Sequence, residues 1–354
     1  MIRKATLCLF LLLSATSYAQ QKGAYKDVSI PNKDITLSGT LIIPPGDKPV
    51  PAVILISGSG PHDRNETIAG KKPFLVIAEY LTRRGIAVLR YDDRGTSRST
   101  GDYESAILPD FAADAQAAFN FLRKEPGIDP GKIGILGHSE GAMIGQIMAA
   151  GEKYLGFFVS MAGPAQDGIL MAKEQSNLLY KDLPAAEGKV LRDIMDTLRQ
   201  VVLEETDTVV MNSRIFNFVG KQYDSGELGL GGLITKEQFV EMYIANYRRP
   251  GFKALLLHDP TKFYSRIKCP VLAVNGDKDV HVDCEANLRA WKTGLTATGN
   301  SRVTIKAFPG LNHLFQRCKS CTIFEYGELP ETISPEVLAY IQEWIAVQTG
   351  LKKS

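Results

Sequence analysis

The chain has 354 residues, of which 44% are hydrophobic, 41 are basic and 39 are acidic. This length and composition suit a globular protein with a large hydrophobic core. The formal net charge is +2, and it falls to near zero if the N-terminal leader described next is removed. So small a charge gives no electrostatic basis for binding nucleic acid or an anionic membrane, and we expect neither as a partner.

The N-terminus has the pattern of a secretory signal peptide. Two basic residues precede an apolar stretch over residues 5–13, and Ser17 and Ala19 provide a cleavage site of small residues. We therefore expect residues 1–19 to be removed and the mature protein to be secreted or periplasmic. The apolar stretch is too short for a retained membrane helix, and no other segment approaches ~18 apolar residues, so we expect no membrane insertion.

Strand and helix patterns alternate through the first half of the mature chain. Residues 28–43 alternate in polarity around a Pro-Asn-Lys-Asp turn, which predicts an antiparallel hairpin at a sheet edge. Apolar runs predict buried strands, and segments with helical spacing separate several of them. The strands are expected at 52–56, 86–90, 133–136 and 154–161, and the helices at 73–84 and 109–124. This rhythm predicts a mostly parallel, doubly wound α/β sheet.

The alternation stops between residues 165 and 267. This segment has apolar residues at helical spacing and no run that resembles a buried strand, which predicts a helical cap inserted after the sixth strand. The alternation then resumes, with strands expected at 269–275 and 302–308 and helices at 287–295 and 335–347. We therefore divide the mature chain into a core of residues 20–164 and 268–354 and a cap of residues 165–267.

Residues 137–141 read Gly-His-Ser-Glu-Gly and stand between a predicted strand and a predicted helix, with Ser139 at the bend. Glycine is expected on both sides, because side chains there would collide with the adjoining strand and helix. Such a bend exposes the Ser139 hydroxyl and directs the backbone N–H of Glu140 at an oxyanion. We therefore predict Ser139 as a nucleophile and the Glu140 N–H as an oxyanion donor.

A serine hydroxyl needs a base, and the base needs a group that orients it. The carboxyl ends of the later strands supply both: Asp277 and Asp279 follow one strand, and His313 follows the next. The order along the chain is then Ser139, Asp279 and His313, with Asp277 as the competing acid. Of the other histidines, His138 is expected only to fill the bend.

These motifs together resemble the α/β-hydrolase superfamily. They are the bend at 137–141, the acid loop at 276–280, the histidine loop at 310–315 and the Asp-Arg-Gly loop at 93–95. Within the superfamily, the chain is similar to secreted bacterial carboxylesterases and to the serine aminopeptidase and lysophospholipase-like group. The resemblance implies a mostly parallel sheet with a helical cap after the sixth strand.

The resemblance also implies roles for single residues. Asp279 has the position of the acid in the family's Gly-x-x-Asp pattern, which makes Ser139, His313 and Asp279 the catalytic triad. Ser57 and Gly58 stand where the family has His-Gly, so the backbone N–H of Ser59 is the expected second oxyanion donor. Neither a metal nor a cofactor is expected.

The cysteines suggest a brace between the two catalytic loops. Cys284 lies five residues after Asp279 and Cys318 lies five residues after His313, and these loops must be neighbours if the triad assembles. We therefore predict a disulfide from Cys284 to Cys318 or Cys321, with a local Cys318–Cys321 bond as the alternative. No matching metal-ligand set accompanies these residues, so zinc is not expected. The mature chain has four cysteines, Cys269, Cys284, Cys318 and Cys321.

The sequence therefore predicts a secreted serine hydrolase that cleaves small or medium acyl esters through an acyl-enzyme, with a small ester as its partner. An aminopeptidase or acyl-peptide amide hydrolase is an alternative, and it needs an acidic cap residue to bind the substrate ammonium. A thioesterase is a further alternative, as is a catalytically silent binding protein on the same fold. The candidate acidic cap residues are Glu204, Glu205, Asp224 and Glu241.

Overall fold

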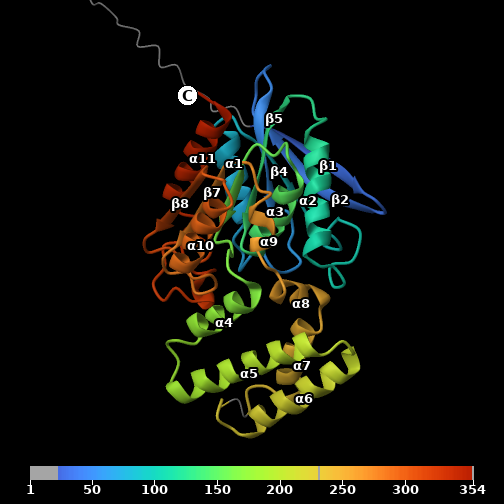
Figure 1. Cartoon of the computed structure of the whole chain (residues 1–354), viewed down its shortest axis with the longest axis vertical. Coiled ribbons are helices and arrows are strands. Elements are labelled where there is room, and N and C mark those ends of the chain that lie inside the picture. Colours follow the sequence, from blue (N-terminus) through green and yellow to red (C-terminus); the bar gives the residue numbers. More distant parts are fainter. Residues whose placement is uncertain (1–22, 230–231, 353–354) are drawn as a thin grey trace, which may run out of the picture.

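The computed structural model describes residues 23–229 and 232–352. The expected signal peptide, residues 1–19, lies outside the described residues. An eight-stranded sheet forms the centre, with helices packed on both faces and a separate group of helices beyond one end of the strands (Figure 1). Within the described part of the chain, no helix combines the length and the apolar character needed to span a membrane.

The sheet has the strand order β1-β2-β4-β3-β5-β6-β7-β8. β1 and β2 form an antiparallel edge hairpin and β2 pairs antiparallel with β4, whereas the remaining neighbours are parallel. The predicted hairpin and the predicted mostly parallel α/β sheet are confirmed. The strands are β1 (Ala24–Asn32), β2 (Ile35–Ile43), β3 (Val50–Ile56), β4 (Ala87–Tyr91), β5 (Ile128–His138), β6 (Phe158–Met161), β7 (Val271–Gly276) and β8 (Val303–Phe308).

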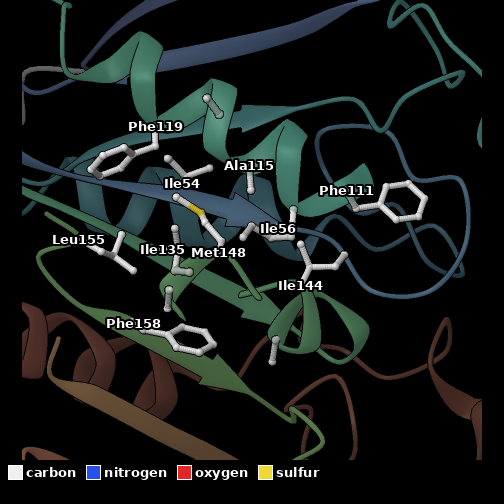
Figure 2. Packing of buried hydrophobic residues seen from close by; sticks show 14 of the residues in the cluster. Ile54, Ile56, Phe111, Ala115, Phe119, Ile135, Ile144, Met148, Leu155 and Phe158 are labelled. Atoms are coloured by element: carbon white, nitrogen blue, oxygen red, sulfur yellow. The ribbon is translucent and has the colours of Figure 1, made fainter. Parts of the chain in front are cut away.

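Helices cover both faces of the central strands, which explains their continuous apolar runs. Side chains of α1 and α11 pack on one face, and those of α2, α3 and α10 pack on the other. On the second face, Ile54 and Ile135 of the sheet meet Phe119 of α2 and Met148 of α3 (Figure 2). These helices are α1 (Pro73–Thr82), α2 (Leu108–Leu122), α3 (Glu140–Gly151), α10 (Cys284–Ala297) and α11 (Pro335–Thr349).

The predicted helical insertion after the sixth strand is confirmed. Among the described residues, six helices follow β6 and precede β7, and Figure 1 shows α5, α6 and α7 farthest from the sheet. They have an apolar cluster of their own, which includes Ile194, Ile215 and Phe239. The boundaries at residues 165 and 267 stay a prediction. The helices are α4 (Gly168–Leu179), α5 (Ala185–Glu204), α6 (Thr208–Asp224), α7 (Lys236–Tyr247), α8 (Pro250–Leu256) and α9 (Thr261–Tyr264).

The predicted disulfide from Cys284 to Cys318 or Cys321 is wrong. The structure joins Cys318 to Cys321, which was the alternative, and Cys269 and Cys284 are free thiols. Cys284 is the first residue of α10, and its side chain packs against the hydrophobic core on the face of the sheet covered by α2, α3 and α10. Burial raises the pKa of the Cys269 and Cys284 thiols to about 12.

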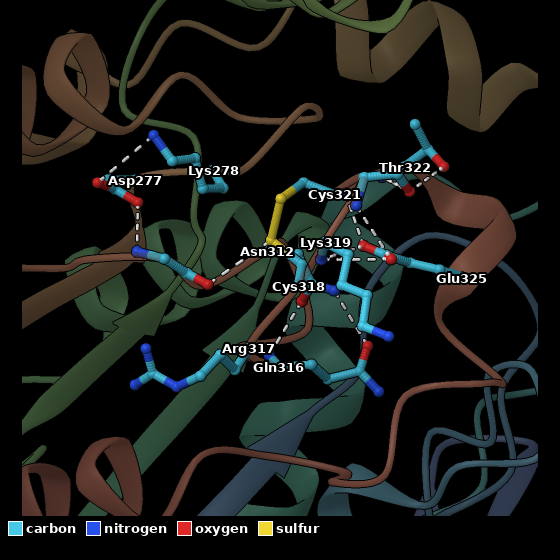
Figure 3. The surroundings of a disulfide bond; sticks show 12 residues. Asp277, Lys278, Asn312, Gln316, Arg317, Cys318, Lys319, Cys321, Thr322 and Glu325 are labelled. Carbon is cyan, nitrogen blue, oxygen red and sulfur yellow. Dashed lines mark hydrogen bonds and ion pairs between the residues drawn. A yellow bond between two sulfur atoms is a disulfide. The ribbon is translucent and has the colours of Figure 1, made fainter.

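The Cys318–Cys321 bond closes a short loop after β8 (Figure 3). The Glu325 carboxylate caps this loop by accepting hydrogen bonds from the backbone N–H groups of Lys319, Ser320 and Cys321. Glu325 itself ends a short 3₁₀ helix, η1 (Ile323–Glu325), whose first residue lines a cavity described below. The disulfide therefore stabilises a segment beside the candidate site.

Candidate active site

The elbow at Ser139 has a strained backbone. β5 ends at His138 and α3 begins at Glu140, which places Ser139 between them with φ 53° and ψ −121°. Positive φ is uncommon for a residue with a side chain. A Cβ atom at Gly137 would lie 2.2 Å from the Gly141 carbonyl oxygen, and one at Gly141 would lie 2.2 Å from the Ile56 oxygen. The steric reason for both glycines is therefore confirmed.

Asp279 and His313 lie in hydrogen-bond contact on the loops after β7 and β8. The distance from His313 Nδ1 to Asp279 Oδ2 is 2.8 Å, and both side chains are buried. Burial raises the pKa of Asp279, but the charge and the hydrogen bond of His313, the charge of His281 and the Val282 N–H together lower it below its usual value. A carboxylate on Nδ1 leaves Nε2 as the ring atom that can accept a proton.

Asp277, the competing acid, has a different position. One of its carboxylate oxygens accepts a hydrogen bond of 2.7 Å from the backbone N–H of Gly310, at the start of the histidine loop. Asp277 therefore ties the acid loop to the histidine loop, and Asp279 is the acid that contacts the imidazole.

Ser139 and His313 line the same cavity, which has a volume of about 340 Å³. Among the residues that the structure describes, the Ser139 hydroxyl makes no hydrogen bond to the His313 ring. The structure thus places Ser139 and His313 on one cavity, and Asp279, which does not line that cavity, contacts the His313 ring directly.

The backbone N–H groups expected to hold an oxyanion are free. Gly58 N–H donates to Glu66 Oε1 over 2.7 Å, and Gly60 N–H donates to the Tyr103 hydroxyl over 2.7 Å. The N–H groups of Ser59, between them, and of Glu140, at the start of α3, have no acceptor among the described residues. Both residues line a second cavity together with Ser139.

Hydrogen bonds to the Asp93 side chain fix the loop that carries Ser59. This buried carboxylate accepts hydrogen bonds from the Ser57 hydroxyl over 2.6 Å and from the His62 N–H over 2.9 Å. Burial raises the pKa of Asp93 to about 8, against the lowering effect of these two donors. The neighbouring Arg94 forms an ion pair with Asp114 of α2, with 2.7 Å between Nε and Oδ2, so this contact links the 93–95 loop to that helix.

Comparisons with known proteins show what the sequence and the fold of this chain are similar to. A family model described as X-Pro dipeptidyl-peptidase (S15 family) matches residues 33–186. Two solved structures superpose on most of the chain: an esterase of Pyrococcus furiosus, Pf2001, with TM-score 0.56, and a proline iminopeptidase of Mycobacterium smegmatis, with TM-score 0.55. Each is 18% identical in sequence; they cover 93% and 92% of this chain, which covers 92% and 99% of theirs. The chain therefore has the α/β-hydrolase fold.

A curated relative extends the comparison to sequence. Esterase EstD of Thermotoga maritima is 30% identical over 289 residues, which are 81% of this chain and 60% of the relative. The chain therefore spans about 60% of the length of that protein.

The second cavity lies between the core and the cap. It has a volume of about 350 Å³, and its apolar lining includes Met143 of α3 and Met171 of α4. Arg249, at the start of α8, is the cation among its lining residues, and Glu140 is the carboxylate. The acidic cap residues considered for an ammonium, Glu204, Glu205, Asp224 and Glu241, are not among the residues that line it.

The structure adds two residues to the site that the sequence did not single out for a role there. His138 was expected only to fill the elbow, but its Nδ1 lies 2.9 Å from Glu66 Oε1 and its Nε2 lies 3.2 Å from the His313 carbonyl oxygen. Glu66 belongs to an irregular loop between β3 and α1, where no periodic pattern marks it. The contact joins two loops that only the folded sheet brings together.

Proposed function

We propose that the protein is a serine esterase that cleaves small or medium acyl esters through an acyl-enzyme. One observation carries this proposal: a strained elbow serine and a histidine held by a buried carboxylate line the same cavity. The similarity to esterase EstD and to the Pyrococcus furiosus esterase supports an ester as the substrate.

The proposed mechanism assigns each step to a group on the chain. The Ser139 hydroxyl oxygen attacks the ester carbonyl while His313 Nε2 takes its proton, and His313 then gives that proton to the departing alcohol. Asp279 holds the imidazole through Nδ1 and stabilises the imidazolium that forms. A water molecule then gives a proton to His313 and attacks the acyl carbonyl. The bond to Ser139 breaks, the carboxylic acid leaves, and His313 returns the proton to the Ser139 oxygen.

The N–H groups of Ser59 and Glu140 are proposed to hold the negative oxygen of both tetrahedral intermediates. Removing one donor of this kind typically lowers kcat by about 10² to 10³. The cavity between the core and the cap has a volume of about 350 Å³, near the lower end of the range for ligand pockets. Its size and apolar lining favour a small or medium acyl or alcohol group.

Amide hydrolysis is the second candidate function. The match to the X-Pro dipeptidyl-peptidase model supports it, as does the Glu140 carboxylate in the cavity. A substrate ammonium could bind that carboxylate, although Glu140 also accepts a hydrogen bond from the Ser59 hydroxyl. Burial raises the pKa of Glu140 and so opposes the charged carboxylate that an ammonium site needs.

The experiment that separates these functions compares substrates on purified protein. We expect hydrolysis of p-nitrophenyl esters from acetate to octanoate, with little hydrolysis of aminoacyl-p-nitroanilides. Faster turnover of an aminoacyl anilide than of any ester would favour the peptidase. A protein that hydrolyses neither substrate and is not labelled by a fluorophosphonate would be a binding protein on this fold.

We also propose that the protein is exported, with residues 1–19 removed. The signal-peptide pattern supports this, and the Cys318–Cys321 disulfide is of a kind that persists in oxidising compartments. The intact mass of protein purified from its own host without reductant tests both points. We expect a chain that begins at Gln20 with one disulfide, and a cytoplasmic chain that retains Met1 would contradict export.

A further inference from the structure

We propose that Glu66 and His138 form a buried ion pair that positions the catalytic loops, which makes Glu66 a positioning residue for the reaction. The catalytic part of this inference rests on the proposed function, whereas the charge state of the pair can be tested without any substrate. Neither residue belongs to the triad or supplies an oxyanion donor.

One oxygen of Glu66 has two donors. Glu66 Oε1 accepts from the Gly58 backbone N–H over 2.7 Å and lies 2.9 Å from His138 Nδ1. The Glu66 residue is 1% exposed, and its backbone has φ 50°, an uncommon conformation for a residue with a side chain. Strain of this kind persists where surrounding contacts hold it in place, often at functional sites.

His138 has acceptors on both ring nitrogens. Nδ1 faces the Glu66 carboxylate and Nε2 faces the His313 carbonyl oxygen at 3.2 Å. A neutral imidazole carries one N–H and can donate to only one of them, so both contacts require a doubly protonated ring. Burial opposes that charge, but Glu66 and the His313 carbonyl outweigh it and raise the pKa of His138.

The pair connects three loops of the proposed mechanism. Gly58 precedes Ser59, His138 precedes Ser139, and the carbonyl that His138 contacts belongs to His313. The packing is close: a Cβ atom at Gly58 would lie 3.3 Å from both Glu66 Oε1 and Ser139 Cβ. A change in the charge or position of the pair therefore shifts the oxyanion donor, the nucleophile and the base relative to one another.

Other charged and titratable groups face the pair from neighbouring loops. Asp279 attracts the His138 charge, and Glu66 repels the buried Asp93 carboxylate, which adds to the rise in the pKa of Asp93. The His313 ring lies 4.9 Å from the His138 ring and 4.6 Å from the His281 ring, centroid to centroid. Burial and the neighbouring histidines lower the pKa of His281 to about 3, so His281 is neutral near pH 7.

The charge state is tested by nitrogen-15 NMR of the histidine rings near pH 8. We expect one ring with protons on both nitrogens, and we expect its signals to be absent from His138→Gln. In Glu66→Gln the amide oxygen can still accept from Gly58 and Nδ1, and His138 should then carry a single proton. A His138 ring with one proton in the wild-type protein would overturn the proposal.

The positioning role is tested by kinetics of ester hydrolysis. For Glu66→Gln we expect kcat to fall by about 10- to 100-fold, the scale of a 1 Å misplacement, with KM changed less than about threefold. The matched control is Asp114→Asn, which also removes a buried carboxylate from an ion pair but lies away from the cavities around Ser139. We expect the control to lose stability and to keep kcat within about twofold, because its effect is structural only.

The outcomes separate this inference from the proposed function. A kcat for Glu66→Gln within twofold of the wild type, or an equal loss in Asp114→Asn, would refute the positioning role. If Glu66→Gln does not fold, His138→Gln takes its place with the same expected loss of kcat. A wild-type protein that hydrolyses no ester but shows the doubly protonated ring would contradict the esterase and leave the ion pair established.

Discussion

The loops at the carboxyl edge of the core sheet and the helices of the cap are stabilised by different kinds of interaction. At the carboxyl edge of the sheet, buried charged and polar groups fix the loops: Asp279 on His313, Glu66 on His138, and Asp93 on Ser57. The cap has an apolar cluster, and most of its ion pairs, such as Lys189 with Asp193, are exposed.

This difference suggests a division of labour. Buried polar contacts cost stability unless every partner is present, so they are retained where geometry matters. Apolar packing tolerates changes of side chain if volume is kept. We therefore expect variants of the core loops to abolish chemistry, and variants of the cap to change substrate preference modestly.

The largest effect is expected from the acid. Asp279→Asn should lower kcat by about 10⁴-fold, because an amide favours the wrong tautomer of the histidine. Asp277→Asn, which alters the contact to Gly310 and spares the imidazole, should cost far less. Ester hydrolysis by the two purified variants tests this prediction. Equal losses in both would remove the distinction between the two acids.

The elbow glycine gives the next largest effect, on stability. Gly137→Ala places a Cβ atom 2.2 Å from a backbone oxygen, and we expect it to destabilise the fold by about 3 kcal/mol or more. Gly151→Ala at the end of α3 meets no atom within 4 Å and should be neutral or slightly stabilising. Urea unfolding of both variants measures the difference. A Gly137→Ala protein as stable as the wild type would contradict the tight elbow.

Asp93 should give a pH dependence of stability. Its pKa in the folded protein is raised to about 8, above the value of about 4 for an unfolded chain, so folding favours the protonated form. The contribution of Asp93 to the free energy of unfolding is therefore fully present below about pH 4 and is lost as the pH rises through about 8. We expect the Tm to fall over this range in the wild type, and to fall less in Asp93→Asn. Parallel profiles for the two proteins would contradict the shift.

The smallest effect is expected from the cap. Met171→Ala on α4 enlarges the cavity near the serine, and a longer acyl group can fill the space at about 0.8 kcal/mol per methylene. We expect kcat/KM to shift by a few-fold toward longer p-nitrophenyl esters, with little change in kcat on the acetate. A drop on every ester comparable with that of Asp279→Asn would break the contrast between core and cap.

Much of the fold could be predicted from the sequence because local patterns determine it. Runs such as 52–56 and 133–136 are apolar because helices cover both faces of the sheet, and the glycines at 137 and 141 mark the elbow. Asp279 and His313 follow consecutive strands of a parallel sheet, so their loops had to meet at one edge. Their catalytic roles and those of Ser139, Ser59 and Glu140 stay predictions.

The rest could not be predicted because it depends on side-chain direction and on contacts between distant loops. Spacing from the triad predicted Cys284 near Cys318, but the Cys284 side chain packs against the core and remains a free thiol, while Cys318 bonds to Cys321. The contact of Glu66 with His138 joins an irregular loop to the elbow, and no periodicity marks either end. The carboxylate in the cavity is Glu140 of the elbow itself, whereas the sequence suggested the cap.

The central claim is that the Ser139 hydroxyl is made reactive by His313 and Asp279, and covalent labelling tests it most directly. After incubation with a fluorophosphonate near pH 8, we predict one adduct, mapped by mass spectrometry to Ser139, and none in Ser139→Ala. In His313→Gln, labelling should be slower by several orders of magnitude. An unlabelled wild-type protein, or an adduct that persists in Ser139→Ala, would contradict the account.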